Sequence, residues 1–496
     1  MAPIISDMTV HFRHDRSIAQ MMLENPSNVD ANKAISEDIL TGKTLTYGSL
    51  REDAFKAAWA LRHRLGLKTG DTVTIIARSC VDYIIATHAI WAAGGIVSTI
   101  NHSSSAKEIT HAIEIIRPQF FIVDGDYEKK LHEALGSEHY DSMTIMTMVS
   151  RFAGHLLFPN DLISDSKRVE PEAYVLDGQD ARTRCAALVM SSGTTGLPKA
   201  VMLSHYNLTG ICEGLRAHNP DNWRESMREV FFPSLSHIYG LYVCALMSPW
   251  LGYYVCMVSQ FQLETYCQLM HEKRATLARL VPPVAVMLAE NPIVDQYQYP
   301  DLEYFSCSAA PLKPAVASKH MAVLNCPLAL QKGESETRTL LSLPGYKDNG
   351  EGTRESMHGP GWYKTGDIGY LNDKGYLIIV DRLKDVIKYK GFQISPTELE
   401  EIIGRHPMVK DSGVTSIWDD VEGTEIPLAF VVPSSPIASI DRESLAKEIQ
   451  DLVAREVAGY KKLRGGVRFI DQLPRNLTGK MLRRQLRDRA GSKAHL

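Results

Sequence analysis

The chain contains 496 residues, of which 44% are hydrophobic and 23% are charged, and its net charge is −4. This composition is typical of a globular protein, and it excludes a disordered, collagen-like or coiled-coil chain. At roughly 100–200 residues per domain, the length predicts two to four domains. The near-neutral charge gives no reason to expect nucleic acid or an acidic membrane surface as a partner.

The eight cysteines show no regular spacing, so we expect unpaired, buried thiols in a reducing compartment. Charged side chains interrupt the first 22 residues, and no signal peptide is expected. Residues 238–263 carry no charge over a length that could cross a membrane. Because Pro249 and Gly252 break this stretch, we predict a buried helix, a turn and a strand there, and no transmembrane segment.

The first third of the chain alternates helical and extended patterns. Capping boxes, in which a serine is followed three residues later by a glutamate, mark two helix starts, at Ser49 with Glu52 and at Ser105 with Glu108. Helices are predicted at residues 50–65, at 81–93 and before Pro118, and strands at 72–77, 96–100 and 120–123. This alternation predicts an α/β fold in which helices cover both faces of a parallel or mixed sheet.

A change of pattern near residue 381 predicts a domain boundary. The strand pattern at 375–380 is followed by the charged segment 381–385 and then by a helix that begins at Pro396. We therefore predict a large N-terminal domain at 1–380, a hinge at 381–384, and a small, mobile α+β C-terminal domain at 385–496.

The strongest local motif is found at residues 191–199, which read Ser-Ser-Gly-Thr-Thr-Gly-Leu-Pro-Lys between two apolar runs. Glycines let the backbone curl, and the hydroxyl and N–H donors suit phosphate oxygens, while Lys199 adds a positive charge. Because Ala200 and a predicted strand follow, this is not a Walker loop. The alternative interpretation is a polar hairpin turn.

A second motif places a carboxylate and an arginine close to a predicted strand. Asp367 ends the sequence Trp-Tyr-Lys-Thr-Gly-Asp, and Arg382 follows fifteen residues later. A carboxylate can accept both hydroxyls of a ribose, and an arginine can donate to the same sugar or its phosphate. By itself, Thr-Gly-Asp is also a common turn. Two further motifs accompany it, Asp-Arg-Leu-Lys-Asp-Val-Ile-Lys-Tyr-Lys-Gly at 381–391 and Pro-Arg-Asn-Leu-Thr-Gly-Lys at 474–480.

Together these motifs resemble the adenylate-forming (AMP-binding) superfamily, and within it the 4-coumarate–CoA ligase-like acyl-CoA synthetases. The resemblance runs from about residue 45 to residue 489. It implies an acid–thiol ligase that activates a carboxylic acid as an acyl-adenylate with release of pyrophosphate and then transfers the acyl group to CoA. ATP, Mg²⁺ and CoA are the cofactor and substrates that it implies.

The resemblance also implies residue roles. The residues that bind ATP or AMP would be Ser191, Ser192, Gly193, Thr194, Thr195, Gly196, Lys199, Ala309, Ala310, Pro311, Asp367 and Arg382. Lys480 would neutralise charge between the acid and the α-phosphate, Lys384 would be the hinge residue, and Lys388 would face the site in a second conformation. Without the resemblance, each lysine is expected to be an exposed surface charge.

The remaining implied roles concern CoA and the acyl group. Lys390 and Gly391 would lie beside CoA, where glycine leaves room for the thin pantetheine arm. His237 would border the acyl pocket and move aside for CoA; alone, a histidine in an apolar run is more often a hydrogen-bonded core residue. Tyr239, Val281, Pro282 and Pro283 would line the acyl pocket.

The pattern departs from the family after residue 307. Ser308 stands where glycine is expected, and residues 331–337 replace an aromatic-Gly-x-Thr-Glu signature, with Lys332 in the place of the stacking aromatic and Glu336 as the match to the magnesium ligand. Strands of a barrel-like subdomain that the family has are missing near residues 338–344, which indicates an internal deletion. Three explanations are open: the remaining chain repacks, the protein is a decayed relative, or the gene was mis-spliced or misread. The alternative function is therefore a catalytically impaired homologue that binds an acyl or nucleotide ligand, or a partner, without turnover.

The C-terminal region is basic, with eleven Lys or Arg and two Asp in residues 461–496. This charge could steer the polyanions ATP and CoA toward the protein, or form a solvated helix face at Arg483, Arg484, Arg487 and Arg489. Ala494-His495-Leu496 resembles the peroxisomal Ser-Lys-Leu address, so we expect a peroxisomal location through an import receptor, and otherwise a cytoplasmic one. A role in secondary metabolism is a further expectation.

Overall fold

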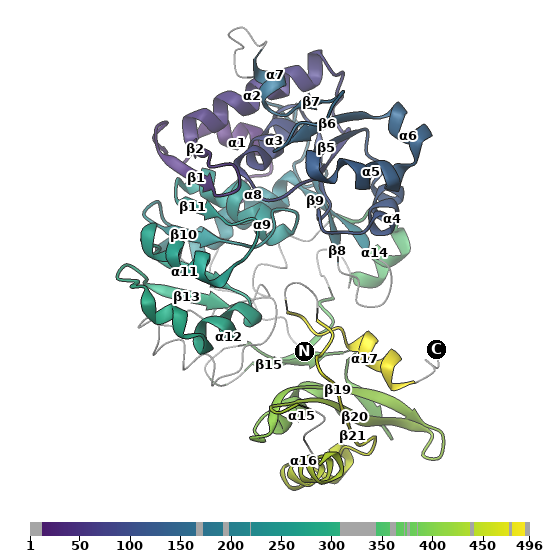
Figure 1. The fold of residues 1–496 in the computed structure, drawn as a ribbon. Coiled ribbons are helices and arrows are strands. Elements are labelled where there is room, and N and C mark those ends of the chain that lie inside the picture. The colour runs from purple at the N-terminus through teal and green to yellow at the C-terminus, as the bar shows by residue number, and fades with distance from the viewer. Residues whose placement is uncertain are drawn as a thin grey trace. The chain divides into compact units, whose positions relative to one another are not determined.

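The computed structural model describes residues 12–164, 172–191, 198–218, 220–307, 344–357, 364–371, 373, 377–383, 385–436, 441–475 and 479–491. The chain forms two compact units, whose ribbons are drawn in Figure 1. The larger unit contains residues 1–280, 284–308 and 313–363, and the smaller unit contains residues 281–283, 309–312 and 364–496. The sequence-based boundary at residue 380 and the hinge at 381–384 stay predictions.

The larger unit contains an eight-stranded sheet. Its strands lie in the order β14 (Gly345–Tyr346), β9 (Lys199–Ser204), β8 (Cys185–Ser191), β4 (Ile96–Thr99), β3 (Thr72–Ile76), β5 (Phe120–Asp124), β6 (Thr144–Met148) and β7 (Leu156–Leu157). The ladders from β8 through β7 are parallel, whereas β9 is antiparallel to both its neighbours. Every residue of β3 and β5 is buried, as expected for strands covered on both faces. The three strands predicted in this region are confirmed.

A six-stranded sheet is the second sheet of the larger unit. Its strands lie in the order β13 (Tyr304–Cys307), β12 (Leu277–Leu280), β10 (Arg228–Phe231), β11 (Tyr254–Met257), β1 (Ala34–Asp38) and β2 (Thr44–Thr46). Only the ladder between β1 and β2 is antiparallel among these described strands. Parallel neighbours require crossover connections, and helices provide them.

Thirteen described helices belong to this part of the chain (Figure 1). They are α1 (Ile18–Glu24), α2 (Tyr47–His63), α3 (Val81–Ala92), α4 (Ala106–Ile116), α5 (Glu128–Leu135), α6 (Ser137–Ser142), α7 (Asn160–Ile163), α8 (His205–His218), α9 (Ile238–Tyr242), α10 (Ser248–Leu251), α11 (Leu263–Glu272), α12 (Pro282–Glu290) and α14 (Gly350–Ser356). All twelve residues of α3 are buried, so this helix lies inside the core.

The two predicted capping boxes had different outcomes. Ser105 caps α4 together with Glu108, as predicted. The box at Ser49 was wrong, because α2 begins one turn earlier, where the Thr46 hydroxyl accepts a hydrogen bond from the Ser49 backbone N–H. The Ser49 hydroxyl in turn accepts from the Thr46 backbone N–H at 3.0 Å, so Ser49 takes the place of the usual Glu or Gln. The first turn of α2 is buried through Tyr47, which the spacing of apolar residues did not reveal.

The uncharged stretch after residue 238 folds as predicted. It forms α9, a short π-helical turn at Val243–Met247, α10, and then β11. Gly252 ends α10 with a φ of +74°, a conformation that favours glycine. Among the described residues, no helix combines the length and the apolar composition needed to cross a membrane.

The smaller unit contains short sheets and three described helices. Its elements are β15 (Asp367–Leu371), β16 (Leu377–Arg382), β17 (Ile387–Tyr389), β18 (Phe392–Ile394), α15 (Pro396–Ile403), β19 (Val409–Asp419), β20 (Thr424–Pro433), α16 (Arg442–Glu456), β21 (Val467–Phe469) and α17 (Arg483–Ala490). β19 and β20 form a long antiparallel ladder, to which β21 adds a parallel strand. The predicted helix at Pro396 is confirmed.

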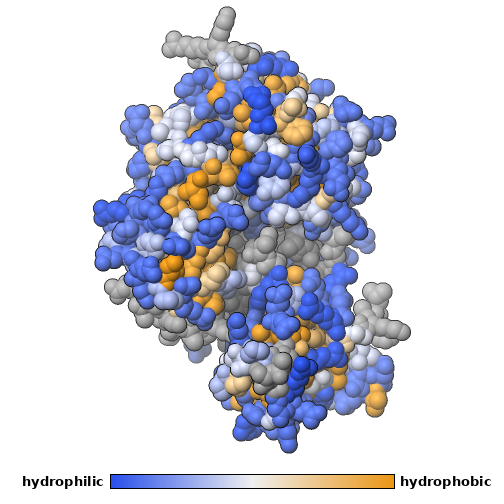
Figure 2. Space-filling view, viewed as in Figure 1, coloured by the Kyte–Doolittle hydropathy of each residue, from blue (hydrophilic) through white to orange (hydrophobic). Residues whose placement is uncertain are grey.

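The packing agrees with the composition. A continuous core joins α2, α3 and both sheets of the larger unit, and a separate core lies between α15, α16 and β19–β20 in the smaller unit. Hydrophilic residues cover most of the visible surface of both units in Figure 2. The cysteines that the structure describes are free thiols, most of them buried. The predicted mixed α/β fold, with a large sheet-containing unit and a smaller α+β unit, is confirmed.

Two buried histidines make the larger unit sensitive to acid. Burial lowers the pKa of His88 and of His205 to about 4, from the usual 6.5. Both side chains are therefore neutral in the folded chain at pH 6, whereas the unfolded chain protonates them. We expect the free energy of unfolding to be highest above pH 6.5 and to fall by up to about 3 kcal/mol per histidine as the pH drops to 4. Urea unfolding at a series of pH values measures this.

The matched variants are His88→Gln and His63→Gln. His88→Gln removes one of the two titrating groups, so the decline of unfolding free energy between pH 6.5 and 4 should become shallower. His63 is exposed at the end of α2, and His63→Gln should leave the decline unchanged. An equal pH dependence in all three proteins would contradict the prediction.

Candidate functional site

The ends of the predicted phosphate loop lie side by side. Ser191 is the last residue of β8, Lys199 is the first of β9, and the two are partners in the antiparallel ladder. The Ser191 hydroxyl donates to the Lys199 carbonyl oxygen at 3.1 Å. The ammonium group of Lys199 lies 5.0 Å from the ring centroid of Tyr346 in β14, a cation–π distance. Residues 192–197 between them, which include Ser192, Gly193, Thr194, Thr195 and Gly196, lie outside the described residues.

His237 caps the helix that carries part of the predicted acyl pocket. It is exposed at the N-cap of α9, where its Nδ1 accepts a hydrogen bond from the Tyr239 backbone N–H at 3.1 Å. This exposed position is not that of a core histidine. The ring of Tyr239 lies 5.6 Å from Phe231 and 5.4 Å from Tyr242. A side chain in place of Gly240 would lie 2.2 Å from the Ser234 carbonyl oxygen, so glycine is required here.

The other predicted acyl-pocket residues follow β12. Val281 is buried, and Pro282 and Pro283 form the first turn of α12. Proline suits this position because the first N–H groups of a helix have no partner within it. The acyl-pocket role of these residues, and of Tyr239, stays a prediction.

In the smaller unit, the predicted ribose-binding residues form a pair. Asp367 and Arg382 face each other across the β15–β16 ladder. Arg382 Nε lies 3.2 Å from Asp367 Oδ1, and the Asp367 backbone N–H donates to the Thr365 hydroxyl at 3.0 Å. The Asp367 side chain is only 12% exposed, whereas Arg382 is 39% exposed. A carboxylate acceptor therefore stands beside a guanidinium donor, as binding of a sugar hydroxyl pair and its phosphate requires.

Lys480 belongs to the same charged environment. Its side chain is half-buried, and burial together with the charge of Arg382 lowers the pKa of its ammonium group. The charges of Asp385 and Asp367 act in the opposite direction. The structure therefore pairs Asp367 with Arg382, and their charges act on Lys480, the third residue that the family resemblance implies for nucleotide and phosphate chemistry.

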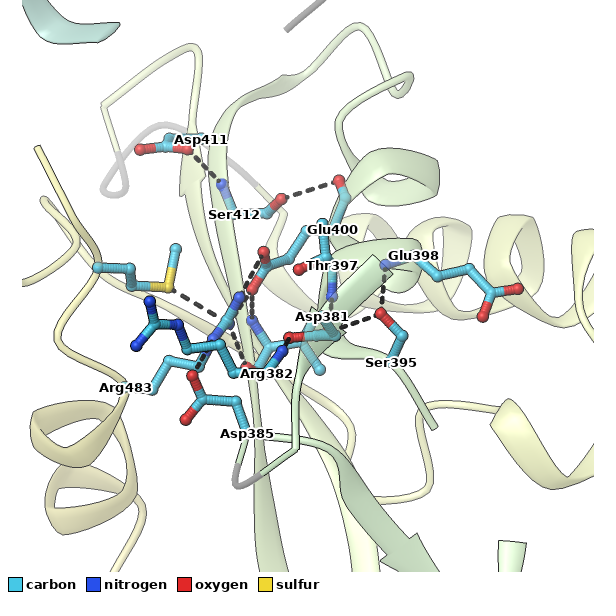
Figure 3. Close-up of polar contacts among 12 residues, drawn as sticks. Asp381, Arg382, Asp385, Ser395, Thr397, Glu398, Glu400, Asp411, Ser412 and Arg483 are labelled. Carbon is cyan, nitrogen blue, oxygen red and sulfur yellow. Dashed lines mark hydrogen bonds and ion pairs between the residues drawn. The ribbon is translucent and has the colours of Figure 1, made fainter. Parts of the chain in front are cut away.

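The polar network around this site is shown in Figure 3. Arg483 donates to both carboxylate oxygens of Glu400 and to the Val414 carbonyl oxygen at 2.8 Å. Glu400 also accepts from the Val414 backbone N–H at 2.7 Å. Asp381 accepts from the Ser395 hydroxyl at 2.6 Å and from the Thr397 backbone N–H at 3.2 Å, which fixes the end of β16 against the start of α15.

This network corrects one sequence-based expectation. Arg483 is not part of a solvated helix face, since its side chain is only 13% exposed and binds Glu400, whose side chain is 14% exposed. Burial raises the pKa of Glu400 even beside Arg483, because the carboxylate loses its hydration. Arg484 and Arg489 are exposed, as the solvated interpretation expects.

The predicted CoA-side residues form a tight turn. Lys390 and Gly391 join β17 to β18, with φ angles of +45° and +83°. Two positive φ angles are typical of a two-residue hairpin turn, and this backbone conformation accounts for Gly391. A Cβ at Gly391 would meet no atom within 4 Å in the described structure. Lys388 is exposed, and Lys390 pairs with Glu422 at 3.3 Å, which raises the pKa of Lys390.

Sequence reasoning missed an aromatic and basic surface beside this turn, which we name the hairpin patch. Its members are Tyr389, Lys390, Phe392, Tyr460, Lys461 and Arg464. The rings of Phe392 and Tyr460 stack at 4.5 Å, and the guanidinium of Arg464 lies 4.3 Å from the ring of Tyr389. Phe392 is 53% exposed. The available signal was the aromatic residue directly after Gly391 and the tyrosine directly before the basic C-terminal region.

Several predicted residues lie outside the described part of the chain. They are the adenine-side residues Ala309, Ala310 and Pro311, the magnesium candidate Glu336, and the hinge candidate Lys384. In the described residues, no group of three or more His, Cys, Asp or Glu side chains is arranged to hold a metal ion.

The Glu400–Arg483 pair should be important for stability. Glu400→Gln removes the nearest counter-charge of the buried guanidinium and leaves the more distant Asp385, so we expect the free energy of unfolding to fall by roughly 3 kcal/mol. Urea denaturation measures the change.

Glu398→Gln is the matched control, because Glu398 lies on the same helix but its side chain is 40% exposed in its pair with Lys461. Glu398→Gln should lower the free energy of unfolding by less than about 1 kcal/mol. Equal losses in the two variants would show that burial of the charge does not decide the effect.

The comparison with family models and the comparison with individual proteins agree with each other. A family model described as AMP-binding enzyme matches residues 24–385, and one described as AMP-binding enzyme C-terminal domain matches residues 398–480. The 4-coumarate–CoA ligase-like protein 1 of Arabidopsis thaliana is 30% identical over 532 aligned positions, which cover 95% of this chain and 94% of that protein. The 4-coumarate–CoA ligase 1 of Petroselinum crispum is 28% identical, with 95% and 93% covered.

Solved structures share the fold. ATP-bound MatB from Rhodopseudomonas palustris superposes with a TM-score of 0.79 at 22% identity, over 95% of this chain and 98% of that chain. The anthranilate CoA ligase AuaEII, in complex with anthranoyl-AMP, has a TM-score of 0.80 at 20% identity, over 97% and 98% of the two chains.

Proposed function

Because this chain belongs to the AMP-binding enzyme family, we propose that it is an ATP-dependent acyl-CoA ligase that activates a carboxylic acid as an acyl-adenylate and passes the acyl group to CoA. The observation that carries the proposal is the Asp367–Arg382 pair of the smaller unit, whose two charges also act on the ammonium group of Lys480. These three side chains supply the acceptor and the two cations that an adenylate needs.

The first half-reaction requires orientation and neutralisation of charge. A carboxylate is a poor electrophile, so it must be activated before a thiol can attack it. In the activation step its oxygen attacks the α-phosphate as a nucleophile, which brings two anions together. Lys480 would lie between the acid and the α-phosphate, Asp367 would accept the ribose hydroxyls, and Arg382 would donate to the same nucleotide. The residues at 191–199 would hold the outer phosphates, with Lys199 fixed over Tyr346. Among the related structures, MatB binds ATP and AuaEII binds anthranoyl-AMP.

The second half-reaction requires a surface for CoA. The hairpin patch offers the exposed ring of Phe392, stacked on Tyr460, for a nucleotide base. Arg464 can donate to phosphates, as can Lys390 and Lys461 if phosphates displace their partners Glu422 and Glu398. It lies directly beside Lys390 and Gly391, which the sequence predicts for CoA. We assign the CoA nucleotide to this patch.

Mg²⁺ is proposed from the family resemblance alone. When bound beside ATP, the ion neutralises phosphate charge and orients the leaving pyrophosphate. Glu336, its proposed ligand, lies outside the described residues.

The internal deletion also remains a proposal. The alignment with the Petroselinum crispum ligase spans 530 positions, which is more than the 496 residues of this chain and therefore leaves gaps in it. The impaired-homologue alternative is not favoured, because the relatives are ligases along nearly their whole length and the charged site is assembled. A peroxisomal location and a role in secondary metabolism are further proposals, the first resting on residues 494–496.

Lys480→Ala tests the assignment of the adenylating cation. We expect acid-dependent exchange between ATP and labelled pyrophosphate to fall by about 10²–10³-fold, because charge developing at the α-phosphate is no longer neutralised. Exchange is measured with a panel of carboxylic acids.

Lys447→Ala removes an exposed lysine from α16 of the same unit and should leave exchange unchanged. Full exchange by a folded Lys480→Ala protein would refute the role of Lys480. The absence of exchange with every acid in the unaltered chain would refute the ligase itself.

Phe392→Ala tests the CoA surface. Loss of one stacking ring should raise the KM for CoA by roughly tenfold and leave acid-dependent pyrophosphate exchange unchanged, because the first half-reaction does not use CoA. Steady-state thioester formation at varied CoA concentration measures the KM.

Trp418→Ala is the control, since Trp418 is another exposed aromatic residue of the smaller unit, at 41% exposure, and lies outside the hairpin patch. If both variants keep the original KM for CoA, the patch does not bind the nucleotide.

A further inference from the structure

Lys199 and Tyr346 lie on the same face of two neighbouring strands. β14 pairs antiparallel with β9, and Tyr346 is opposite Val201 in this ladder. Lys199 lies two residues before Val201 on β9, so it shares a face with Val201 and is the diagonal neighbour of Tyr346. Diagonal neighbours are within reach when their side chains are long or aromatic. The ammonium group of Lys199 accordingly lies 5.0 Å from the centroid of the Tyr346 ring.

The first turn of α14 borders the same ammonium group. This helix begins at Gly350, shortly after β14, and is labelled in Figure 1. Gly352 is buried in the turn, and a Cβ placed on it would lie 3.0 Å from Lys199 Nζ and 2.8 Å from Oδ1 of Asn349, the N-cap residue. Glycine therefore leaves the space beside the ammonium group. The ring of Tyr346 and the backbone of Gly352 together limit where the flexible Lys199 side chain can go.

The backbone at Lys199 is anchored by β8 and by α4. The Lys199 N–H donates to the Ser191 hydroxyl at 3.3 Å, and this hydroxyl donates to the Lys199 carbonyl oxygen at 3.1 Å. His111 on α4 donates from Nε2 to the carbonyl oxygen of Pro198 at 3.2 Å. Both the backbone and the side chain of Lys199 are therefore held in place, which reduces the entropy lost when the lysine meets an anion.

An aromatic ring holds an ammonium group without neutralising it. The negative face of the ring attracts the cation, and the charge of the lysine stays available to an anionic partner. Within the described part of the chain Lys199 forms no ion pair, whereas Lys390 is paired with Glu422. This arrangement suits a lysine that meets phosphate, because no carboxylate among the described residues has to be displaced first.

We propose that Tyr346 is a positioning residue for ATP: its ring holds the ammonium group of Lys199 ready for the outer phosphates, and Gly352 leaves room for that group. The proposal rests on the proposed function for the role of Lys199 at the phosphates. The contact of Lys199 with Tyr346 and Gly352 is a property of the folded chain. Residues 344–357 follow the segment in which the internal deletion is proposed, so this support for Lys199 comes from chain beyond the deletion.

Tyr346→Leu removes the aromatic face and keeps an apolar side chain in β14. We expect the KM for ATP in acid-dependent pyrophosphate exchange to rise by about two- to fivefold, as loss of one cation–π contact predicts, while kcat changes by less than about twofold. Tyr346→Phe keeps the ring face and should retain the original KM. An unchanged KM for ATP in folded Tyr346→Leu, or an equal rise in Tyr346→Phe, would overturn the proposal.

A double variant shows whether the effect of Tyr346 passes through Lys199. Lys199→Met should raise the KM for ATP by roughly tenfold, because a charge-assisted contact with phosphate is lost. Adding Tyr346→Leu to Lys199→Met should change the KM no further, since the ring then has no ammonium group to hold. Effects that multiply would show that Tyr346 acts independently of Lys199, which contradicts the proposal.

Gly352→Ala and Gly350→Ala form a matched pair on α14. The first places a methyl group against Lys199 Nζ, so the displaced ammonium group should raise the KM for ATP by about twofold or more. The second places its methyl group 3.4 Å from Arg354 Nη1, an ordinary contact, and should leave the KM unchanged. Equal KM values in the two folded variants would refute the part assigned to Gly352.

Amine labelling tests the contact in the full chain without any substrate. When the ring is removed, the ammonium group is held less and spends more time in solvent. Lys199 in Tyr346→Leu should therefore be acetylated by acetic anhydride about two- to fivefold faster than in the unaltered chain. Peptide mass spectrometry measures modification at Lys199 and, as an internal reference, at the exposed Lys447. Tyr127→Leu is the control, because it removes a ring that lies 5.2 Å from a different lysine, Lys130, and should leave Lys199 labelling unchanged.

The labelling result is independent of the ligase assignment. If the unaltered chain shows no exchange with any acid, the proposed function fails, and the labelling comparison still decides whether Tyr346 holds Lys199. Unchanged labelling of Lys199 in folded Tyr346→Leu, or equal acceleration in Tyr127→Leu, overturns the inference whether or not the chain is a ligase.

Discussion

The pairing of buried charge is the constraint on which both units depend. In the larger unit, Glu229 on β10 and Arg279 on β12 are 0% and 2% exposed and bind each other across the six-stranded sheet. The guanidinium of Arg279 also lies 4.4 Å from the ring of Trp223. An isolated charge at such depth would cost several kcal/mol, so each partner is tolerated only where the other lies within reach. The pair therefore specifies how these two strands are placed beside each other.

The smaller unit repeats this solution beside the residues that are proposed to act on the nucleotide. Glu400 and Arg483 join α15 to α17, and the free edge of Arg483 reaches the carboxylate of Asp385. Lys480, on the loop just before α17, is half-buried, and the charges of Arg382, Asp385 and Asp367 act on its ammonium group. In the proposed function, the buried pair would brace the start of α17, and Lys480 just before it would supply the charge that acts on the nucleotide. A cation that stabilises a transition state acts best when it is held in place before the reaction. Movement of the cation during the reaction would weaken its electrostatic stabilisation of the transition state.

Local chemistry explains which sequence-based expectations held. The capping box at Ser105 was readable because Glu108 is exposed and free to bond the N-cap. At α2 the same pattern was misleading, since Thr46 and Ser49 formed the reciprocal bonds one turn earlier and Glu52 pairs with Lys56 at 2.6 Å instead. Arg483 was expected in solvent because its neighbours in sequence are basic. Its burial is set by Glu400, more than eighty residues away, and no local pattern contains that information.

The sequence by itself determined the α/β alternation, the ends of several helices and the motifs that carry the family resemblance, because hydrophobic period, capping and glycine-rich turns act over a few residues. It also named Asp367, Arg382 and Lys480. Only the tertiary structure decided that Asp367 pairs with Arg382, that both charges act on Lys480, that Arg483 is buried against Glu400, and that Phe392, Tyr460 and Arg464 lie together. Those relations join segments tens of residues apart, and they arise because charges and aromatic rings find their partners only after the strands and helices have packed.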